Sequence, residues 1–251
     1  MRFIVSIICL CFLSLAANAQ SAASDIAHGD REYAALSAEP ALASFEKALA
    51  ADPRSYEALW KASRSAVDIG SYIPDAKRRE ALYLKAEQYA RRAMALNPGG
   101  AEGHFSLARA LGKTALTQSP RGRVKYATEI RTQALECLRI DPKHPGCLHV
   151  MGMWNAEVMR LNSVTRLIAR NILGGKTFGA ASWKEAVRYM EASVASEPDR
   201  IVHHVDLGEV YSDVGEKAKA RAEFEAAIRL PVTDVNDNVY KAQARARLGT
   251  D

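Results

Sequence analysis

The chain has 251 residues, enough for one array of elements with a continuous core and not obviously for two independent domains. The formal net charge of +5 is a modest surplus. No aromatic residues are interleaved with the basic ones, so the composition argues against nucleic acid as a partner.

The N-terminus has the pattern of a secretory signal. Arg2 precedes an apolar run over residues 3–16, and Ala17-Asn18-Ala19 supplies the small residues that a signal peptidase requires. The run is shorter than the roughly 18 residues that a membrane span needs. We therefore expect a cleaved signal peptide over residues 1–19 and one exported domain over residues 20–251, periplasmic in a Gram-negative bacterium and otherwise secreted. An uncleaved membrane anchor is the alternative.

Helix-ending Asp-Pro or Asn-Pro pairs recur at a near-constant step. Pro53, Pro98 and Pro142 are separated by 98 − 53 = 45 and 142 − 98 = 44 residues. Small and apolar residues precede each proline at helical spacing, and a second set follows in the same register. The preceding sets are Ala41, Phe45 and Ala48; Ala86, Ala90 and Ala93; and Ile130, Ala134 and Cys137. This pattern predicts successive helical hairpins.

The middle hairpins have about ten more residues than the last one, which is roughly three helical turns. We interpret the excess as lengthened helices, with turns at residues 70–74 and 118–122. The next unit carries an insertion over residues 162–181, followed by Ser182-Trp183-Lys184-Glu185, which predicts a capping box and a new helix.

The last unit has the clearest repeat spacing. Gly208, Ala220 and Ala227 are small where two helices approach closely, while Leu207, Tyr211 and Phe224 fill the space beside them and Gly215 occupies the turn. These positions are those of a tetratricopeptide unit. The predicted fold is all-α: a tetratricopeptide-like helical-hairpin solenoid with lengthened middle hairpins.

Two runs resemble a known family. They are His149-Val150-Met151-Gly152-Met153-Trp154 and Ser182-Trp183-Lys184-Glu185-Ala186-Val187, and both resemble the regulator of microtubule dynamics family. The resemblance implies an all-helical interaction domain whose eukaryotic relatives associate with microtubules and organelle membranes. It offers no catalytic residues to carry over.

Such arrays bind extended partners in the concave surface lined by their first helices. The repeat register projects nine residues toward this groove: Trp60, Arg64, Phe105, Arg109, His149, Met153, Glu157, Val205 and Glu209. Aromatic residues would supply buried contact area, and Arg64 and Arg109 could clamp carboxylates. We therefore expect a non-catalytic scaffold for a protein or peptide partner.

Other motifs leave alternatives open. In an oxidising compartment, Cys137 and Cys147 form either one disulfide or two buried thiols. The histidines have no metal-ligand spacing, and no motif predicts catalysis or a cofactor.

Basic residues gather in three clusters: at 77–79; at Arg121, Arg123 and Lys125; and at Arg160, Arg166, Arg170 and Lys176. They are either ordinary solvated faces or a contact for an anionic membrane surface or partner. The amphipathic stretch 164–173 packs either on a membrane interface or on the repeats. The second function hypothesis is a carrier or sensor of an apolar or lipid-like small molecule, and the third is a microtubule-associated regulator.

Overall fold

A computed structural model describes residues 20–161 and 178–249. The predicted signal peptide lies outside these residues, and so do most of the insertion, the stretch 164–173 and the basic residues Arg166, Arg170 and Lys176. In the described part, every regular element is an α-helix, which confirms the all-α prediction. None of the described helices combines the length and apolarity needed to cross a bilayer.

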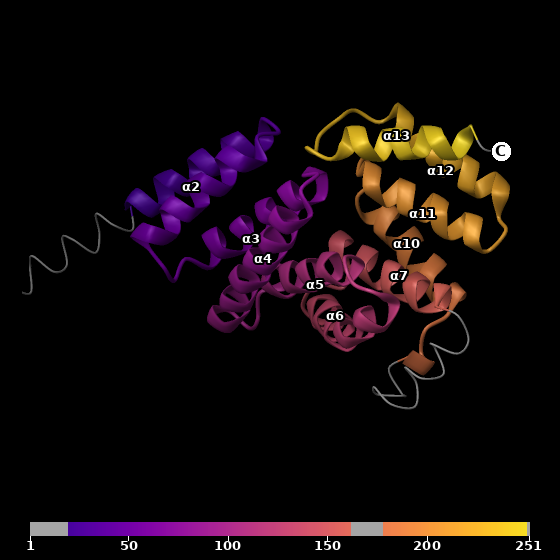
Figure 1. Ribbon diagram of the computed structural model, residues 1–251, viewed down its shortest axis with the longest axis horizontal. Coiled ribbons are helices and arrows are strands. Elements are labelled where there is room, and N and C mark those ends of the chain that lie inside the picture. Colours follow the sequence, from indigo (N-terminus) through magenta and orange to yellow (C-terminus); the bar gives the residue numbers. More distant parts are fainter. Residues whose placement is uncertain (1–19, 162–177, 250–251) are drawn as a thin grey trace, which may run out of the picture.

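The helices follow one another as antiparallel hairpins along an arc (Figure 1). A helix over residues 20–34 comes first. It is followed by α2 (Ala38–Ala51), α3 (Tyr56–Tyr72), α4 (Ala76–Leu96), α5 (Ala101–Leu116), α6 (Pro120–Ile140), α7 (Pro145–Arg160), α10 (Trp183–Ser196), α11 (Ile201–Asp213), α12 (Lys217–Arg229) and α13 (Asp237–Leu248).

The hairpins are α3 with α4, α5 with α6, α7 with α10, and α11 with α12. Their first helices also touch one another in sequence, α3 to α5 to α7 to α11 to α13. This layering is that of a repeat solenoid, in which the first helices form the inner face of the curve.

The middle hairpins are tall, as predicted. Helices α4 and α6 have 21 residues each, whereas α12 has 13. The connections are short: α3 ends at Tyr72 and α4 begins at Ala76, while α5 ends at Leu116 and α6 begins at Pro120. The turn predicted at residues 70–74 starts too early, because Gly70 lies inside α3, where the ring of Tyr83 occupies the space of a side chain.

Polar caps explain where several helices begin. The side chains of Ser55, Asp75 and Ser119 each accept a hydrogen bond from a backbone N–H in the first turn of α3, α4 and α6. Ser182 does the same for the N–H of Glu185 at the start of α10, which is one half of the capping box predicted there. The reciprocal half is absent, because the Ser182 N–H donates to Asn155 and the Glu185 carboxylate pairs with Arg188.

The close approach predicted in the last unit is present. A Cβ atom on Gly208 would lie 2.6 Å from the ring of Phe224, so only glycine fits between α11 and α12. Gly215 has a φ of 81°, the left-handed conformation that the turn between these helices requires. Leu207, Ala220 and Ala227 are buried around this contact, as the register predicted.

The C-terminal part of the array contacts α3, which the sequence did not predict. The segment between α12 and α13 reaches back across the inner face toward α3 (Figure 1). There the amide of Asn236 donates to the carbonyl of Asp68 over 3.2 Å, and Val235 packs against the core formed by the first helices of the chain. The C-terminal segment therefore closes one side of the concave face.

Candidate functional site

A cavity of about 640 Å³ occupies the concave face. Helices α3, α5, α6, α7 and α11 and the segment around Asp234 and Tyr240 contribute its walls. Because these elements belong to successive repeats, the cavity exists only in the assembled array.

One side of the cavity is apolar. It is formed by residues of α5, α6 and α7 together with Phe178: Phe105, Ala108, Val124, Ala127, Ile130, Val150, Met153, Trp154 and Val158. The indole N–H of Trp154 donates to the carbonyl of Ala127 over 2.7 Å, which fixes the ring between α6 and α7. The ring of Phe178 lies 6.2 Å from that of Trp154. This side offers contact area to an apolar group.

The other part of the lining, the ionic side, carries a chain of ion pairs around Asp68, which is fully buried in α3 and does not itself line the cavity. Asp68 accepts a hydrogen bond from Arg109 over 2.6 Å and another from the Tyr33 hydroxyl over 2.8 Å. Nearby, Arg200 donates to Asp234 over 2.7 Å. Burial raises the pKa of Asp234, but the Arg200 guanidinium and the Asn236 N–H outweigh it and lower the pKa on balance.

Histidines continue this ionic side on α7 and α11. His149 is hydrogen-bonded to Asp206 over 2.7 Å, and its ring stacks on that of His203 at 4.9 Å. Burial, and then the neighbouring His149, hold the pKa of His203 well below 6.5. Burial also raises the pKa of Glu197, which lines the cavity beside them.

Arg64 is placed differently from the other arginines of the cavity. Its guanidinium lies over the ring of Tyr33 at 3.6 Å and near Trp60 at 5.2 Å. Its Nε is buried without an acceptor, and no carboxylate of the described residues pairs with it. Arg64 is therefore a cation held in place by aromatic rings and free to meet an anion.

The structure brings most of the predicted groove residues together at the cavity: Trp60, Arg64, Phe105, Arg109, His149, Met153 and Glu157. The prediction was wrong for the other two groove residues. Val205 is fully buried between helices, and Glu209 accepts hydrogen bonds from Gln243 and Arg247 of α13. Helix α13 covers this part of α11, and α11 lines the cavity through Val202, His203 and Asp206 instead.

The prediction that Arg64 and Arg109 together clamp carboxylates of a partner is wrong for one of the two. Arg109 is committed to Asp68 and so is a structural group, while Arg64 keeps the free guanidinium. Glu157 is likewise engaged, with Arg123 and Arg160.

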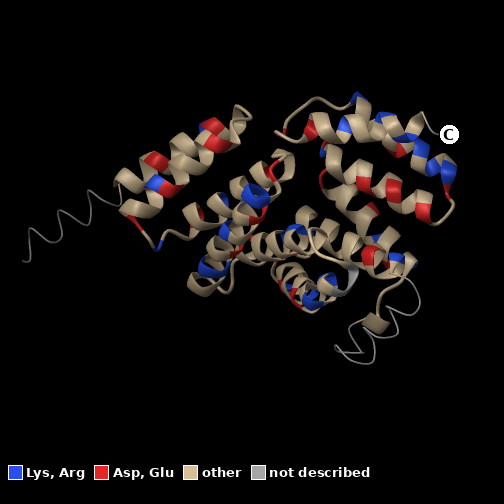
Figure 2. Cartoon of the chain, viewed as in Figure 1, with Lys and Arg blue, Asp and Glu red and all other residues tan. Residues whose placement is uncertain are grey.

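Lys and Arg alternate with Asp and Glu along the described helices (Figure 2). Arg78 pairs with Glu39, and Arg160 pairs with Asp213 at the ends of neighbouring hairpins. Arg79 donates to the carbonyls of Ile73 and Pro74. These described members of the predicted basic clusters thus support intramolecular contacts.

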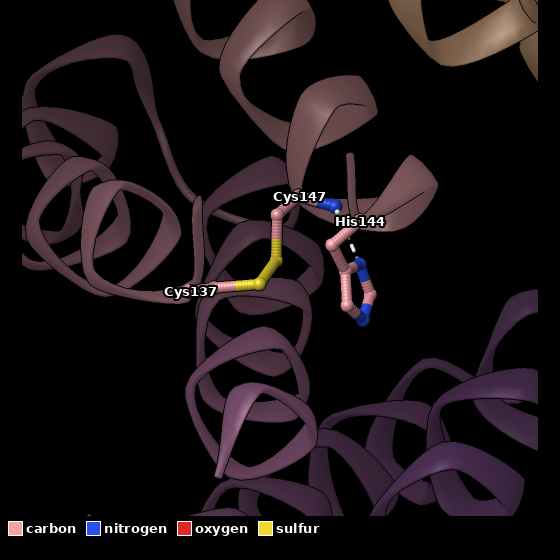
Figure 3. Close-up of side chains that lie close together, drawn as sticks. All are labelled: Cys137, His144 and Cys147. Carbon is pink, nitrogen blue, oxygen red and sulfur yellow. Dashed lines mark hydrogen bonds between the residues drawn. A yellow bond between two sulfur atoms is a disulfide. The ribbon is translucent and has the colours of Figure 1, made fainter. Parts of the chain in front are cut away.

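Cys137 of α6 and Cys147 of α7 are joined by a disulfide (Figure 3). His144 lies beside it and its Nδ1 accepts a hydrogen bond from the N–H of Cys147 over 3.2 Å. In the described residues these three side chains form the one group close enough together to suggest a metal. Sulfur atoms bonded to each other supply no thiolate, so the oxidised group is a cross-link between hairpins.

Two histidines share a structural role that the sequence analysis missed. His104 of α5 bonds Gln133 of α6 and the carbonyl of Pro98, and His204 of α11 bonds Glu223 of α12 and the carbonyl of Pro198. Each histidine lies six residues after a proline, and this shared spacing is the sequence signal that could have predicted their role. Each ties a first helix to its second helix and to the preceding turn.

Comparison with solved structures identifies the class of fold. A thermophilic TPR protein of Thermus thermophilus matches with a TM-score of 0.65 and 19% identity, over 90% of this chain and 99% of that one. PilF of Pseudomonas aeruginosa matches with a TM-score of 0.56 and 14% identity, over 93% of each chain. The fold is a tetratricopeptide-like helical array.

The family is narrower than the fold. The family model of regulator of microtubule dynamics protein 1-3 matches residues 22–250, and the chain belongs to this family. Regulator of microtubule dynamics protein 1 of Bos taurus is 22% identical over 144 residues, which are 57% of this chain and 45% of the bovine protein. The match thus spans less than half the length of that relative.

Proposed function

We propose that this protein is a non-catalytic scaffold that holds a segment of a partner protein in the concave cavity. One observation carries the proposal: side chains that the repeat register projected inward, from α3, α5 and α7, line a single cavity. Tetratricopeptide-like arrays use this face for extended partners.

The chemistry of the walls supports such a partner. Phe105, Met153 and Trp154 offer apolar and aromatic contact area, which is where binding energy concentrates in interfaces. Arg64 offers an unpaired guanidinium on the other side. A segment with apolar side chains and an acidic group fits both.

The test is affinity capture from the cell envelope with three proteins. Wild type is compared with Arg64→Glu, which reverses the charge in the cavity, and with Arg31→Glu, the matched change at an exposed position of the helix over residues 20–34. We expect wild type and Arg31→Glu to recover the same protein and folded Arg64→Glu to lose it. Capture of the same protein by all three would exclude the cavity as the binding site.

Export is part of the proposal and rests on the signal pattern of residues 1–19. We expect the protein in the periplasmic or secreted fraction, with Gln20 at its N-terminus. Recovery in the cytoplasmic fraction with Met1 retained would contradict export.

A carrier of an apolar small molecule is the second candidate. It is favoured by the size of the cavity, about 640 Å³, and by the C-terminal segment that closes one side of it. Sites for small ligands are commonly about 300–1,000 Å³. Native mass spectrometry of the purified protein separates the candidates: a co-purifying apolar compound favours the carrier, and its absence favours the scaffold.

The family name raises a third candidate, association with microtubules. The support is family membership over residues 22–250. An exported protein does not meet microtubules. If the protein cosediments with microtubules and retains Met1, the microtubule candidate is favoured over the scaffold.

A further inference from the structure

A second cavity of about 510 Å³ adjoins the first at the ends of the tall hairpins. Its walls come from the end of α3, the first turns of α4, the end of α5 with the turn after it, and α13 with the preceding Asn236. Lys113, Leu116 and Tyr240 line both cavities. Lys113 is thus the cationic side chain that the two cavities share among the described residues.

Lys113 has no carboxylate within ion-pair distance in the described part of the chain. Of the acidic groups near it, the exposed Glu80 lines the second cavity with it but lies beyond that distance, and the three others are engaged elsewhere. Asp68 is held by Arg109, Asp206 by His149, and Asp234 by Arg200. Burial, and then the positive charge of Arg109, lower the pKa of Lys113, while the three carboxylates act in the opposite direction. A partly buried ammonium without a counter-charge is costly to maintain.

Lys113 borders the open space of both cavities. Lys113 follows Arg109 by one helical turn, while Arg64 precedes Asp68 by one turn on α3. The two unpaired cations therefore flank the Arg109–Asp68 pair. Both line the main cavity, and of the two Lys113 also lines the second cavity.

We propose that Lys113 binds the anionic group of the ligand, whose apolar body lies against Phe105, Met153 and Trp154 in the main cavity. The inference rests on the proposal that this cavity binds a ligand and names the chemistry of that ligand: an acid with an apolar body. An amphipathic small acid and the carboxyl terminus of an apolar peptide share this chemistry.

The first experiment uses two fluorescent probes with the same aromatic body. 8-Anilinonaphthalene-1-sulfonate is an anion, and N-phenyl-1-naphthylamine is uncharged. Because a charge-assisted contact in a cavity is worth about one factor of ten in affinity, we expect wild type to bind the anion about tenfold more tightly than the neutral probe.

Three variants test whether Lys113 causes the preference for the anionic probe. Lys113→Met abolishes it, Lys113→Arg retains most of it, and Lys125→Met leaves it unchanged because Lys125 is an exposed residue of α6 that does not line either cavity. Lys113→Met removes an uncompensated cation, so it unfolds at the same or a higher urea concentration than wild type. A preference that persists in Lys113→Met overturns the inference.

The outcomes separate this inference from the proposed function. Equal binding of both probes in the cavity overturns the role of Lys113 and leaves the cavity as a binding site. Binding of neither probe overturns the inference, and the capture experiment with Arg64→Glu then decides the proposed function separately.

Displacement of the bound anion then distinguishes the two sources. Octanoate and the acid of acetyl-Val-Leu-Phe are compared with their amides. The inference requires that at least one acid displaces the probe and that its amide does not. Octanoate alone points to a small amphipathic acid, the peptide acid alone points to a carboxyl terminus, and displacement by neither contradicts the inference.

Discussion

The hairpin interfaces of this protein are stabilised by apolar packing, whereas the inner wall is stabilised by ion pairs. At the interfaces, small residues meet aromatic or long apolar ones, as at Gly208 with Phe224 and at Gly152 with Met190. On the inner wall, charged side chains from distant parts of the chain pair with one another, as in Asp68 with Arg109. The interfaces hold each repeat together, whereas the ion pairs hold the curve of the array and shape the cavity.

The largest expected effect comes from breaking the inner wall at Asp68. Asp68→Ala leaves the Arg109 guanidinium partly buried without its counter-charge, which is expected to cost about 3–5 kcal/mol of the free energy of unfolding. Urea denaturation followed by circular dichroism measures this loss.

The control is the double variant Asp68→Ala with Arg109→Leu. Because it removes both charges, it should regain a substantial part of the lost stability. A double variant as unstable as the sum of the single ones would show that the pair is not coupled.

The disulfide joins neighbouring hairpins, so its reduction tests the interfaces. Closing a loop between Cys137 and Cys147 is expected to contribute about 2–3 kcal/mol, and reduction should lower the urea midpoint accordingly. Thiol titration of unreduced protein over residues 20–251, in denaturant, checks the bond itself. Two free thiols would contradict it.

Two glycines compare the two regions directly. Gly208→Ala forces a methyl group into the ring of Phe224 and is expected to destabilise the protein by about 1–3 kcal/mol. Gly112→Ala adds the same group where it meets no atom within 4 Å, on the cavity side of α5, and should stabilise by about 0.5–1 kcal/mol through helix propensity. Thermal unfolding of both variants tests the contrast, which fails if both shift the midpoint in the same direction.

The same contrast explains what could be predicted from the sequence. Interface residues recur at fixed spacing, so Gly208, Phe224 and the lengthened helices α4 and α6 followed from periodicity. The register also located the first helices, and most of the residues that it projected inward line the cavity.

The inner network did not follow, because its members have no common period. Asp68 and Asn236 are 168 residues apart, and their contact depends on the curvature accumulated over every intervening repeat. Curvature also brings α13 onto α11, where Glu209 is bound by Arg247 rather than facing a groove. Pairwise spacing contains no information about such accumulated geometry.

The smallest effect distinguishes the two regions by pH, through adjacent histidines of α11. His203 faces the inner wall, and burial followed by His149 holds its pKa well below 6.5. His204 faces α12: burial acts to lower its pKa, but the hydrogen bonds to Glu223 and to the Pro198 carbonyl raise it on balance.

The two histidines therefore have opposite linkage to folding. The unfolded chain protonates His203 more readily than the folded protein, so this residue makes stability fall as the pH drops below about 6.5, by at most about 1.4 kcal/mol per pH unit. The contribution of His204 is fully present below about 6.5 and is lost as the pH rises through its raised folded-state pKa. We expect His203→Gln to flatten the acid-side loss of stability and His204→Gln to steepen it. Urea denaturation between pH 5.5 and 8 measures both, with the exposed His28→Gln as control, and equal slopes in the two variants would contradict the separation of inner wall and interface.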